Sequence, residues 1–125
     1  MQVRQLYHGT TGDNILSILD SGKMNPSAQH EMFFSSSNWQ TVLMYGADRK
    51  RGAAFAIKVA VTIPEHIIQL NASTPGNPDT LILQTIEPLP AQVLELYVRK
   101  PGGDGFEIER IFGELPIRNY LLQSS

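Results

Sequence analysis

The sequence contains no cysteine, and this absence excludes three kinds of chemistry at once. Disulfide bonds, thiolate catalysis and zinc sites with cysteine ligands are all impossible in this chain. The three histidines, His8, His30 and His66, do not follow a metal-ligand spacing such as H-x3-H either. We therefore expect no metal site.

Long apolar runs and an excess of charge of one sign are also absent. No apolar stretch approaches the length of a membrane span, and residues 1–5 lack the apolar segment of a secretory signal. The net charge of −2 argues against a protein that coats nucleic acid by charge alone, although it leaves room for a nucleic-acid substrate in a small local site. We expect a soluble, cytoplasmic protein without a membrane partner.

The residues that are present suffice for one folded domain. A chain of 125 residues, 42% of them apolar, can bury a real core, and we expect a single domain over residues 1–125. Helix-like patterns come early and strand-like patterns dominate later. This mixture favours an α+β fold over a doubly wound sheet.

Apolar periodicity places the individual elements. Ile15, Ile18 and Leu19 form one helix face that ends at Gly22, and Asn38 is placed to cap a second helix. Residues 80–86 are ambiguous between strand and helix, and the basic residues 49–51 are expected in a solvated turn. Loops are expected at 23–31, 71–79 and 101–105, a closing helix at 115–123, and strands at 3–8, 32–35, 53–63, 67–70, 93–98 and 106–112.

The first segment that could carry chemistry is Tyr7-His8-Gly9-Thr10. A strand that ends in His-Gly places a donor and acceptor ring beside a backbone that a ligand can approach closely, because glycine has no Cβ. The alternative is a strand-end histidine that hydrogen-bonds a neighbour before a turn.

The second segment is Phe33-Phe34-Ser35-Ser36-Ser37, followed by Tyr45. Aromatic residues on a strand, followed by hydroxyls and a helix, could build a slot for a flat cationic ring such as nicotinamide. The alternative is that these aromatic residues belong to the core, as most do.

The third segment is Phe106-Glu107-Ile108-Glu109. In a strand, Glu107 and Glu109 point to the same face. Two neighbouring carboxylates can raise one another's pKa, hold the hydroxyls of a sugar, or stabilise an oxocarbenium-like transition state. The alternative is a solvated strand face in which the acids pair with Arg110 or Arg118.

Taken in chain order, these segments resemble a known family. Residues 7–11 resemble the first-strand motif of the diphtheria-toxin-like and poly(ADP-ribose)-polymerase-like ADP-ribosyltransferases, and the helix over 15–22 resembles their "S-I-x-x-G" stretch. Residues 33–36 are similar to the "F-Y-S-T" of the toxins, and residues 45–46 follow at the spacing of their second aromatic. Residues 53–61 resemble their next core strand.

The resemblance covers residues 6–62, about half of the chain. It implies a split β-sandwich of two small packed sheets with flanking helices, which is an α+β fold. It also implies NAD as the substrate. The chain departs from the family at Phe34, which replaces the usual first tyrosine, so that stacking is kept and the hydroxyl is lost.

The resemblance implies roles for the residues that would bind NAD. His8 would hydrogen-bond the ribose on the adenosine side, and Thr10 would lie near the same ribose. Gly9 would hold the nicotinamide amide through its backbone. Phe34 and Tyr45 would sandwich the nicotinamide ring.

The resemblance also implies the catalytic set, which we expect to be Glu109 with His8 and Tyr45. Related arginine-type transferases carry an E-x-E motif whose second acid is catalytic, and Glu109 is the second acid here. Ser35 would support this carboxylate. Glu107 would orient the acceptor or lie at its entry, next to the loop at 101–105.

The activity implied is mono-ADP-ribosylation of a protein or nucleic acid, as in a toxin or a phage–host conflict effector that could have a cognate antitoxin or immunity protein. Three alternatives stay open. They are an NAD glycohydrolase, an RNA 2′-phosphotransferase, which would require more basic groups than residues 49–51 supply, and a degenerate fold that serves as a binding or inhibitory module.

Overall fold

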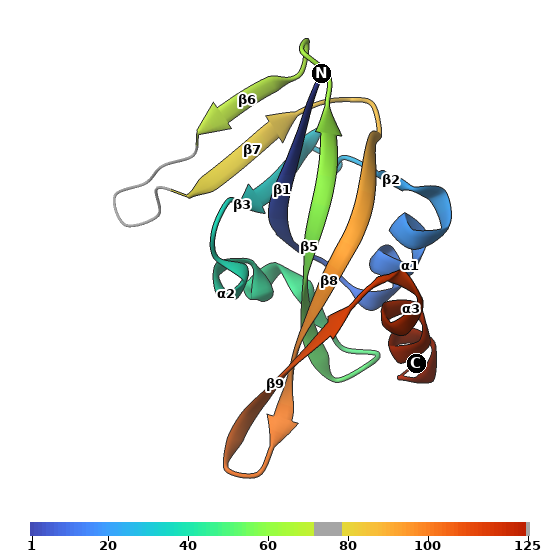
Figure 1. The fold of residues 1–125 in the computed structure, drawn as a ribbon. Coiled ribbons are helices and arrows are strands. Elements are labelled where there is room, and N and C mark those ends of the chain that lie inside the picture. The colour runs from blue at the N-terminus through green and yellow to red at the C-terminus, as the bar shows by residue number, and fades with distance from the viewer. Residues whose placement is uncertain (72–78, 125) are drawn as a thin grey trace.

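The computed structural model of the chain describes residues 1–71 and 79–124 and has an α+β fold (Figure 1). In chain order the elements are β1 (Gln2–Gly9), α1 (Gly12–Ser21), β2 (Lys23–Met24), β3 (Glu31–Ser35), α2 (Trp39–Val42), the 3-10 helix η1 (Leu43–Gly46), β4 (Ala47–Asp48), β5 (Ala53–Ile63), β6 (Ile68–Asn71), β7 (Thr80–Gln84), β8 (Leu89–Gly102), β9 (Gly105–Phe112) and α3 (Glu114–Gln123).

The described strands form one connected antiparallel sheet that curls. The strand order is β2-β8-β5-β1-β3-β7-β6, with β4 paired to β5 and β9 paired to β8. The two separate packed sheets that the family resemblance implies are therefore not found, because hydrogen bonds continue from strand to strand across the whole set. The α+β class is confirmed.

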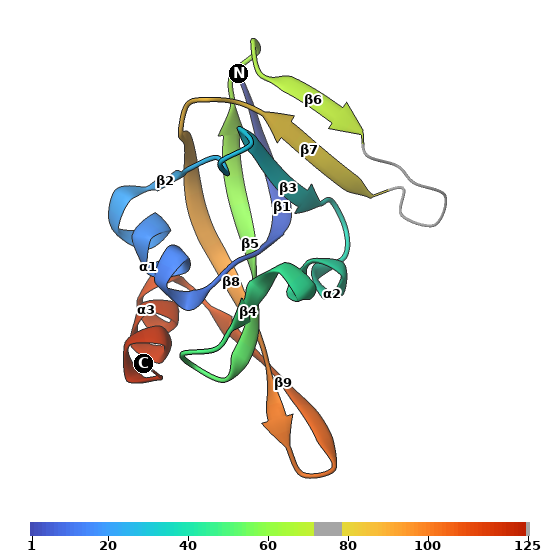
Figure 2. The same cartoon turned by 180° about the vertical axis from the view of Figure 1, so that it is seen from behind.

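Helix α1 begins and ends as the sequence predicts. The side chain of Thr11 accepts a hydrogen bond from the amide of Asn14, and Gly22 ends the helix in the left-handed region at φ 69°. The apolar positions Ile15 and Ile18 are buried against the sheet. Helix α3 lies beside α1 and buries Ile117 and Leu121 in the same core (Figures 1 and 2).

The two sides of β5 are built from residues of different size. Phe55, Ile57 and Val59 point into the core that α1 and α3 cover, whereas Ala54 and Ala56 face α2 and η1. The small side chains leave room for η1 to approach the sheet closely.

Two glycines complete this close approach. A Cβ added to Gly46 would overlap the carbonyl oxygen of Phe55, and a Cβ added to Gly9 would overlap that of Val42. Gly9 is thus required by the packing of α2 against β1, in addition to any role toward a ligand.

Most predicted elements are confirmed, and the differences lie late in the chain. The ambiguous segment 80–86 contains strand β7, and β8 runs from Leu89 to Gly102, well beyond the expected 93–98. The turn after β8 is consequently only two residues long, so most of the loop expected at 101–105 is strand. The loop expected at 71–79 lies mostly outside the described residues. Among the described helices, none is long and apolar enough to cross a membrane.

The basic turn at residues 49–51 differs most from what the sequence predicts. The side chain of Arg51 is only 1% exposed, so the expectation of a fully solvated turn is wrong for this residue. Its guanidinium donates to Asp48 and to Asp13, each at 3.0 Å, and to the carbonyl of Leu121 in α3 at 3.4 Å. Asp48 in turn accepts the amide of Gly12 at 2.9 Å.

These contacts set the protonation of Asp48. Burial alone would raise the pKa of its carboxyl, but hydrogen bonds from the Gly12 amide and from Arg51 outweigh burial, and the pKa lies below its ordinary value. The carboxylate therefore stays charged in the fold, where it satisfies the start of α1 and the buried guanidinium together.

We expect Asp48→Asn to lower the free energy of unfolding by about 3 kcal/mol, because removing one partner of a buried ion pair leaves the other uncompensated. Urea unfolding at neutral pH measures this loss. Asp13→Asn is the matched control, since Asp13 contacts the same guanidinium from an exposed position and its loss should be much smaller. Equal losses in the two variants would show that burial of the pair is unimportant.

The same carboxylate should make stability depend on pH in the acid range. Because the pKa of Asp48 is lower in the folded than in the unfolded protein, its carboxylate stabilises the folded state fully at pH values above the unfolded pKa of Asp, about 3.9. This stabilisation is lost as the pH falls through the folded pKa. Once protonated, Asp48 resembles an asparagine. The gap in unfolding free energy between wild type and Asp48→Asn should therefore close between about pH 5 and about pH 2. A gap that is constant with pH would contradict the assignment.

Candidate functional site

The sheet opens between β1 and β3. β1 pairs with β5 along its whole length, but it shares only the register pair Tyr7↔Ser35 with β3. On its other edge, β3 pairs with β7 over its whole length. A cavity of about 590 Å³ lies beside this opening, which is within the range of small-molecule sites, about 300–1,000 Å³.

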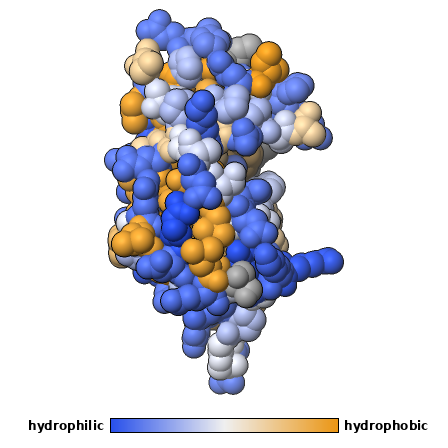
Figure 3. Space-filling model, turned by 90° about the vertical axis from the view of Figure 1, so that its right-hand side faces the viewer, coloured by the Kyte–Doolittle hydropathy of each residue, from blue (hydrophilic) through white to orange (hydrophobic). Residues whose placement is uncertain are grey.

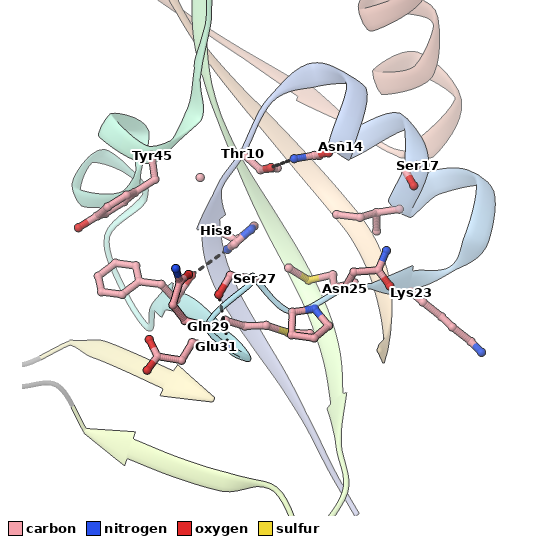
Figure 4. A pocket seen from close by; sticks show the side chains of 16 residues that line it. His8, Thr10, Asn14, Ser17, Lys23, Asn25, Ser27, Gln29, Glu31 and Tyr45 are labelled. Carbon is pink, nitrogen blue, oxygen red and sulfur yellow. Dashed lines mark hydrogen bonds between the residues drawn. The ribbon is translucent and has the colours of Figure 1, made fainter. Parts of the chain in front are cut away.

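The cavity is built from segments that are far apart in sequence. The end of β1 and the start of β3 form one part of its wall, α1 and β2 another, and η1 contributes Tyr45 (Figure 4). The lining residues are His8, Gly9, Thr10, Asn14, Ser17, Ile18, Lys23, Met24, Asn25, Pro26, Ser27, Gln29, Glu31, Met32, Phe33 and Tyr45. The predicted His8-Gly9-Thr10 segment and the predicted Tyr45 therefore meet in one place.

The ring of His8 has a defined tautomer. Its Nδ1 lies 2.8 Å from the carbonyl oxygen of Phe33, and a carbonyl can only accept, so Nδ1 carries the proton. Burial lowers the pKa of the imidazole, and the hydrogen bond to Phe33 offsets this only in part. The neutral ring thus keeps a lone pair on Nε2, which points toward the side of Thr10 and Asn14 (Figure 4). It can accept a hydrogen bond from a ligand hydroxyl.

Thr10 and Asn14 form a polar pair next to this ring. The Nδ2 of Asn14 donates to the hydroxyl oxygen of Thr10 at 3.0 Å. The hydroxyl of Thr10 then has its own proton left to donate to another acceptor. Together with His8, the pair offers both an acceptor and a donor at the inner end of β1.

The aromatic wall differs from the predicted sandwich in one residue. Phe34 is fully buried in the core and contacts the ring of His8 at 5.3 Å, so it does not line the cavity. Adjacent strand residues point to opposite faces, and Phe33 is the one that lines the cavity. The rings of Phe33 and Tyr45 are 4.8 Å apart at 53°, so they touch and leave no room for a ring between them. Tyr45 is 56% exposed, and its outer face is available.

The predicted acids are not in the cavity. Glu109 lies on β9, where its carboxylate contacts the ammonium of Lys100 at 3.3 Å, and the exposed Glu107 is paired in register with Lys100. Neither lines the cavity. β9 extends the sheet beyond β8, on the far side of β5 from β3, so the expectation that the late acid pair completes this site is not met.

Ser35 also has a different role from the one expected. It is buried, does not line the cavity, and its hydroxyl accepts the amide of Asn38 at 3.0 Å. The side chain of Asn38 in turn caps α2 by accepting the amide of Gln40. Ser35 therefore fixes the turn from β3 into α2, which carries the chain toward Tyr45.

The charged groups of the cavity come from residues 23–31, which were expected to form a loop. Among the described lining residues, Glu31 has the only carboxylate and Lys23 the only ammonium or guanidinium. Asn14 and Ser17 were also missed, although their spacing of three residues puts them on one polar side of α1. The run from Lys23 to Glu31 has no apolar periodicity, so the position of Glu31 could not be predicted from local patterns.

Comparisons with protein-family models, with curated proteins and with solved structures return no match to this chain. In the described part of the chain, no three His, Asp or Glu residues gather in a way that could hold a metal ion.

We expect His8 to be neutral at pH 7, with its proton on Nδ1, and to titrate below the ordinary histidine pKa of about 6.5 because burial disfavours the cation. Nitrogen-15 NMR of the imidazole across the acid range reports the tautomer and the pKa together. A proton on Nε2 at neutral pH, or a midpoint above the ordinary value, would remove the acceptor that the site depends on.

Proposed function

We propose that the cavity binds NAD and that the chain is an ADP-ribosyltransferase-type domain, which cleaves the bond between nicotinamide and ribose and passes ADP-ribose to a protein or nucleic-acid acceptor. One observation carries the proposal. The His8-Gly9-Thr10 segment and the aromatic pair of Phe33 and Tyr45 line one cavity although 23 or more residues separate them. The α+β class of the fold is compatible with the proposal, although the described strands form one connected sheet.

The groups in the cavity suit the parts of NAD. A ribose hydroxyl donates to Nε2 of His8, and the nicotinamide ring stacks on the outer face of Tyr45. Among the described residues that line the cavity, Lys23 is the single cation available for the diphosphate. One cation is little for a ligand with an additional phosphate, so the same observation weighs against an RNA 2′-phosphotransferase.

The carboxylate that the reaction requires is Glu31 in this proposal, because Glu109 lies outside the cavity. When the bond breaks, its electron pair leaves with nicotinamide and the ribose carbon becomes positive. A carboxylate nearby stabilises that charge. The acceptor then attacks the carbon and loses a proton. If water attacks instead, the reaction is NAD hydrolysis.

A second candidate function follows from the position of the acids. Both acids of the E-x-E segment lie on the β8–β9 hairpin, outside the cavity. This separation is what a module that binds NAD without cleaving it would show. Binding and cleavage therefore need separate measurements.

We expect wild-type protein to bind NAD in a calorimetric titration, and Tyr45→Ala to weaken binding about tenfold through loss of the stacking face. His8→Ala should weaken it by a similar factor, since the ribose hydroxyl loses its acceptor. Met44→Ala is the matched control, because Met44 is an exposed neighbour of Tyr45 that does not line the cavity. An absence of binding, or equal effects of Tyr45→Ala and Met44→Ala, would rule out this site.

Release of nicotinamide then separates the two candidate functions. Wild type and Glu109→Gln should release nicotinamide at equal rates, and Glu31→Gln should lose release while it keeps NAD binding. If Glu109→Gln loses activity instead, the catalytic role returns to β9. If the wild type binds NAD and releases no nicotinamide, with or without acceptor, the binding-module function is the correct one.

A further inference from the structure

The hairpin of β8 and β9 projects from the body of the protein as an arm. Its two strands pair from Glu95↔Phe112 to Gly102↔Gly105. The arm forms the lower end of the molecule in Figure 1, and the same narrow end is seen from the side of α1 and α3 in Figure 3. Its outer half contacts little of the core, and its residues from Gly103 to Ile108 are exposed.

One face of the arm combines rings with cations. Residues opposite one another in an antiparallel pair share a face, and the register pairs Arg99 with Ile108 and Tyr97 with Arg110. We call this surface the aromatic face of the arm; its exposed or partly exposed members are Arg99, Phe106, Ile108, Arg110 and Phe112, whereas Tyr97 on the same side is only 1% exposed. Phe106 is 70% exposed and Phe112 56%, which is unusual for phenylalanine.

The guanidinium groups lie over these rings. Arg99 is 5.1 Å from the ring centre of Phe106, and Arg110 is 5.3 Å from that of Phe112 and 5.2 Å from that of Tyr97. Each of the two exposed phenylalanine rings of the arm therefore has a guanidinium group over it. An eight-residue strand such as β9 is long enough to contact several nucleotides.

Positive charge on this face is only partly neutralised. Arg110 has one loose ion pair, to Glu95 at 3.8 Å, and Lys58, which pairs in register with Glu95, lies over the ring of Tyr7. In the described part of the chain Arg99 has no carboxylate partner, and its Nε is buried without a hydrogen bond. The opposite face of the arm carries the Lys100–Glu109 pair instead.

Ring contacts continue from the arm toward the cavity. Trp39 stacks on Tyr97 at 4.8 Å and 9°, and Tyr7 meets Tyr97 edge to face at 5.9 Å. Phe33 packs on the same cluster and also lines the cavity. The arm and the cavity are thus linked by ring contacts through Tyr97, which is itself only 1% exposed.

The geometry points to a single-stranded nucleic acid as the partner of the aromatic face. Bases stack on exposed rings without regard to sequence, and guanidinium groups bind the phosphates. That such a strand is the acceptor of ADP-ribose is a step that rests on the proposed function. A second copy of the chain fits less well. Pairing of two β9 strands about Ile108 would place Glu107 opposite Glu109, and like charges directly opposite destabilise a sheet.

The test is fluorescence anisotropy of a labelled single-stranded oligonucleotide of about 12 nucleotides, with DNA and RNA versions and a duplex of the same sequence. Wild type should bind the single strand more tightly than the duplex. Phe106→Ala should weaken binding about tenfold, since one stacked base is lost. Arg99→Gln should weaken it and reduce the dependence on salt by about one phosphate contact.

Lys100→Gln is the matched control, because it removes the same charge from the next residue, which faces the other side of the arm. It should leave binding unchanged. The proposal is overturned if no single strand is bound at low salt, if the duplex binds equally well, if Arg99→Gln and Lys100→Gln have equal effects, or if sedimentation shows a dimer that Phe106→Ala dissolves.

Folding and the proposed function are checked separately. Phe106 is exposed, so circular dichroism should show unchanged thermal unfolding in its variant. NAD titration of the same variants should match wild type, since the arm does not line the cavity. Oligonucleotide binding without NAD binding would refute the proposed function and keep the aromatic face. NAD binding without oligonucleotide binding would refute the role of the aromatic face and leave the proposed function standing.

Discussion

The buried guanidinium of Arg51 joins three parts of the chain that the sequence separates widely. It holds Asp48 at the end of β4, Asp13 in the first turn of α1 and the last turn of α3 through the carbonyl of Leu121. Asp48 also accepts a hydrogen bond from the amide of Gly12, and this bond fixes the point where the chain leaves β1 and enters α1. The His8-Gly9-Thr10 segment comes directly before this point. Its position relative to the cavity therefore depends on an ion pair that makes no contact with the cavity itself.

A second constraint acts from the other side of the sheet. Gly9 and Gly46 allow α2 and η1 to lie against β1 and β5 at backbone distance, since a Cβ at either position would overlap a carbonyl oxygen. This contact places Tyr45 at the cavity, which Phe33 also lines, while Phe34 is buried in the core. The histidine, the threonine and the two lining aromatic rings are thus positioned by packing from both faces of one strand.

Local signals in the sequence were sufficient for much of this architecture. Apolar periodicity and capping residues predicted α1 with its end at Gly22, the cap at Asn38, and β5 with its bounds. They failed where the deciding interaction is distant in sequence. Nothing local distinguishes Arg51 from Arg49, and its burial depends on partners 38 and 70 residues away. The choice between Phe33 and Phe34 is likewise a question of strand register, because a shift of one residue exchanges the two faces.

The same reasoning explains the acids. Glu107 and Glu109 share a face, as their spacing predicts, but the topology places that face on the hairpin beyond β8 and leaves Glu31 as the carboxylate at the cavity. The other face of the hairpin keeps rings and guanidinium groups in the solvent, where burial gives them no stability. An exposed phenylalanine ring lowers solubility, and a cation–π contact at an exposed site contributes only about 0.5–1 kcal/mol to stability. A surface of this composition is therefore better explained by what it binds than by what it stabilises.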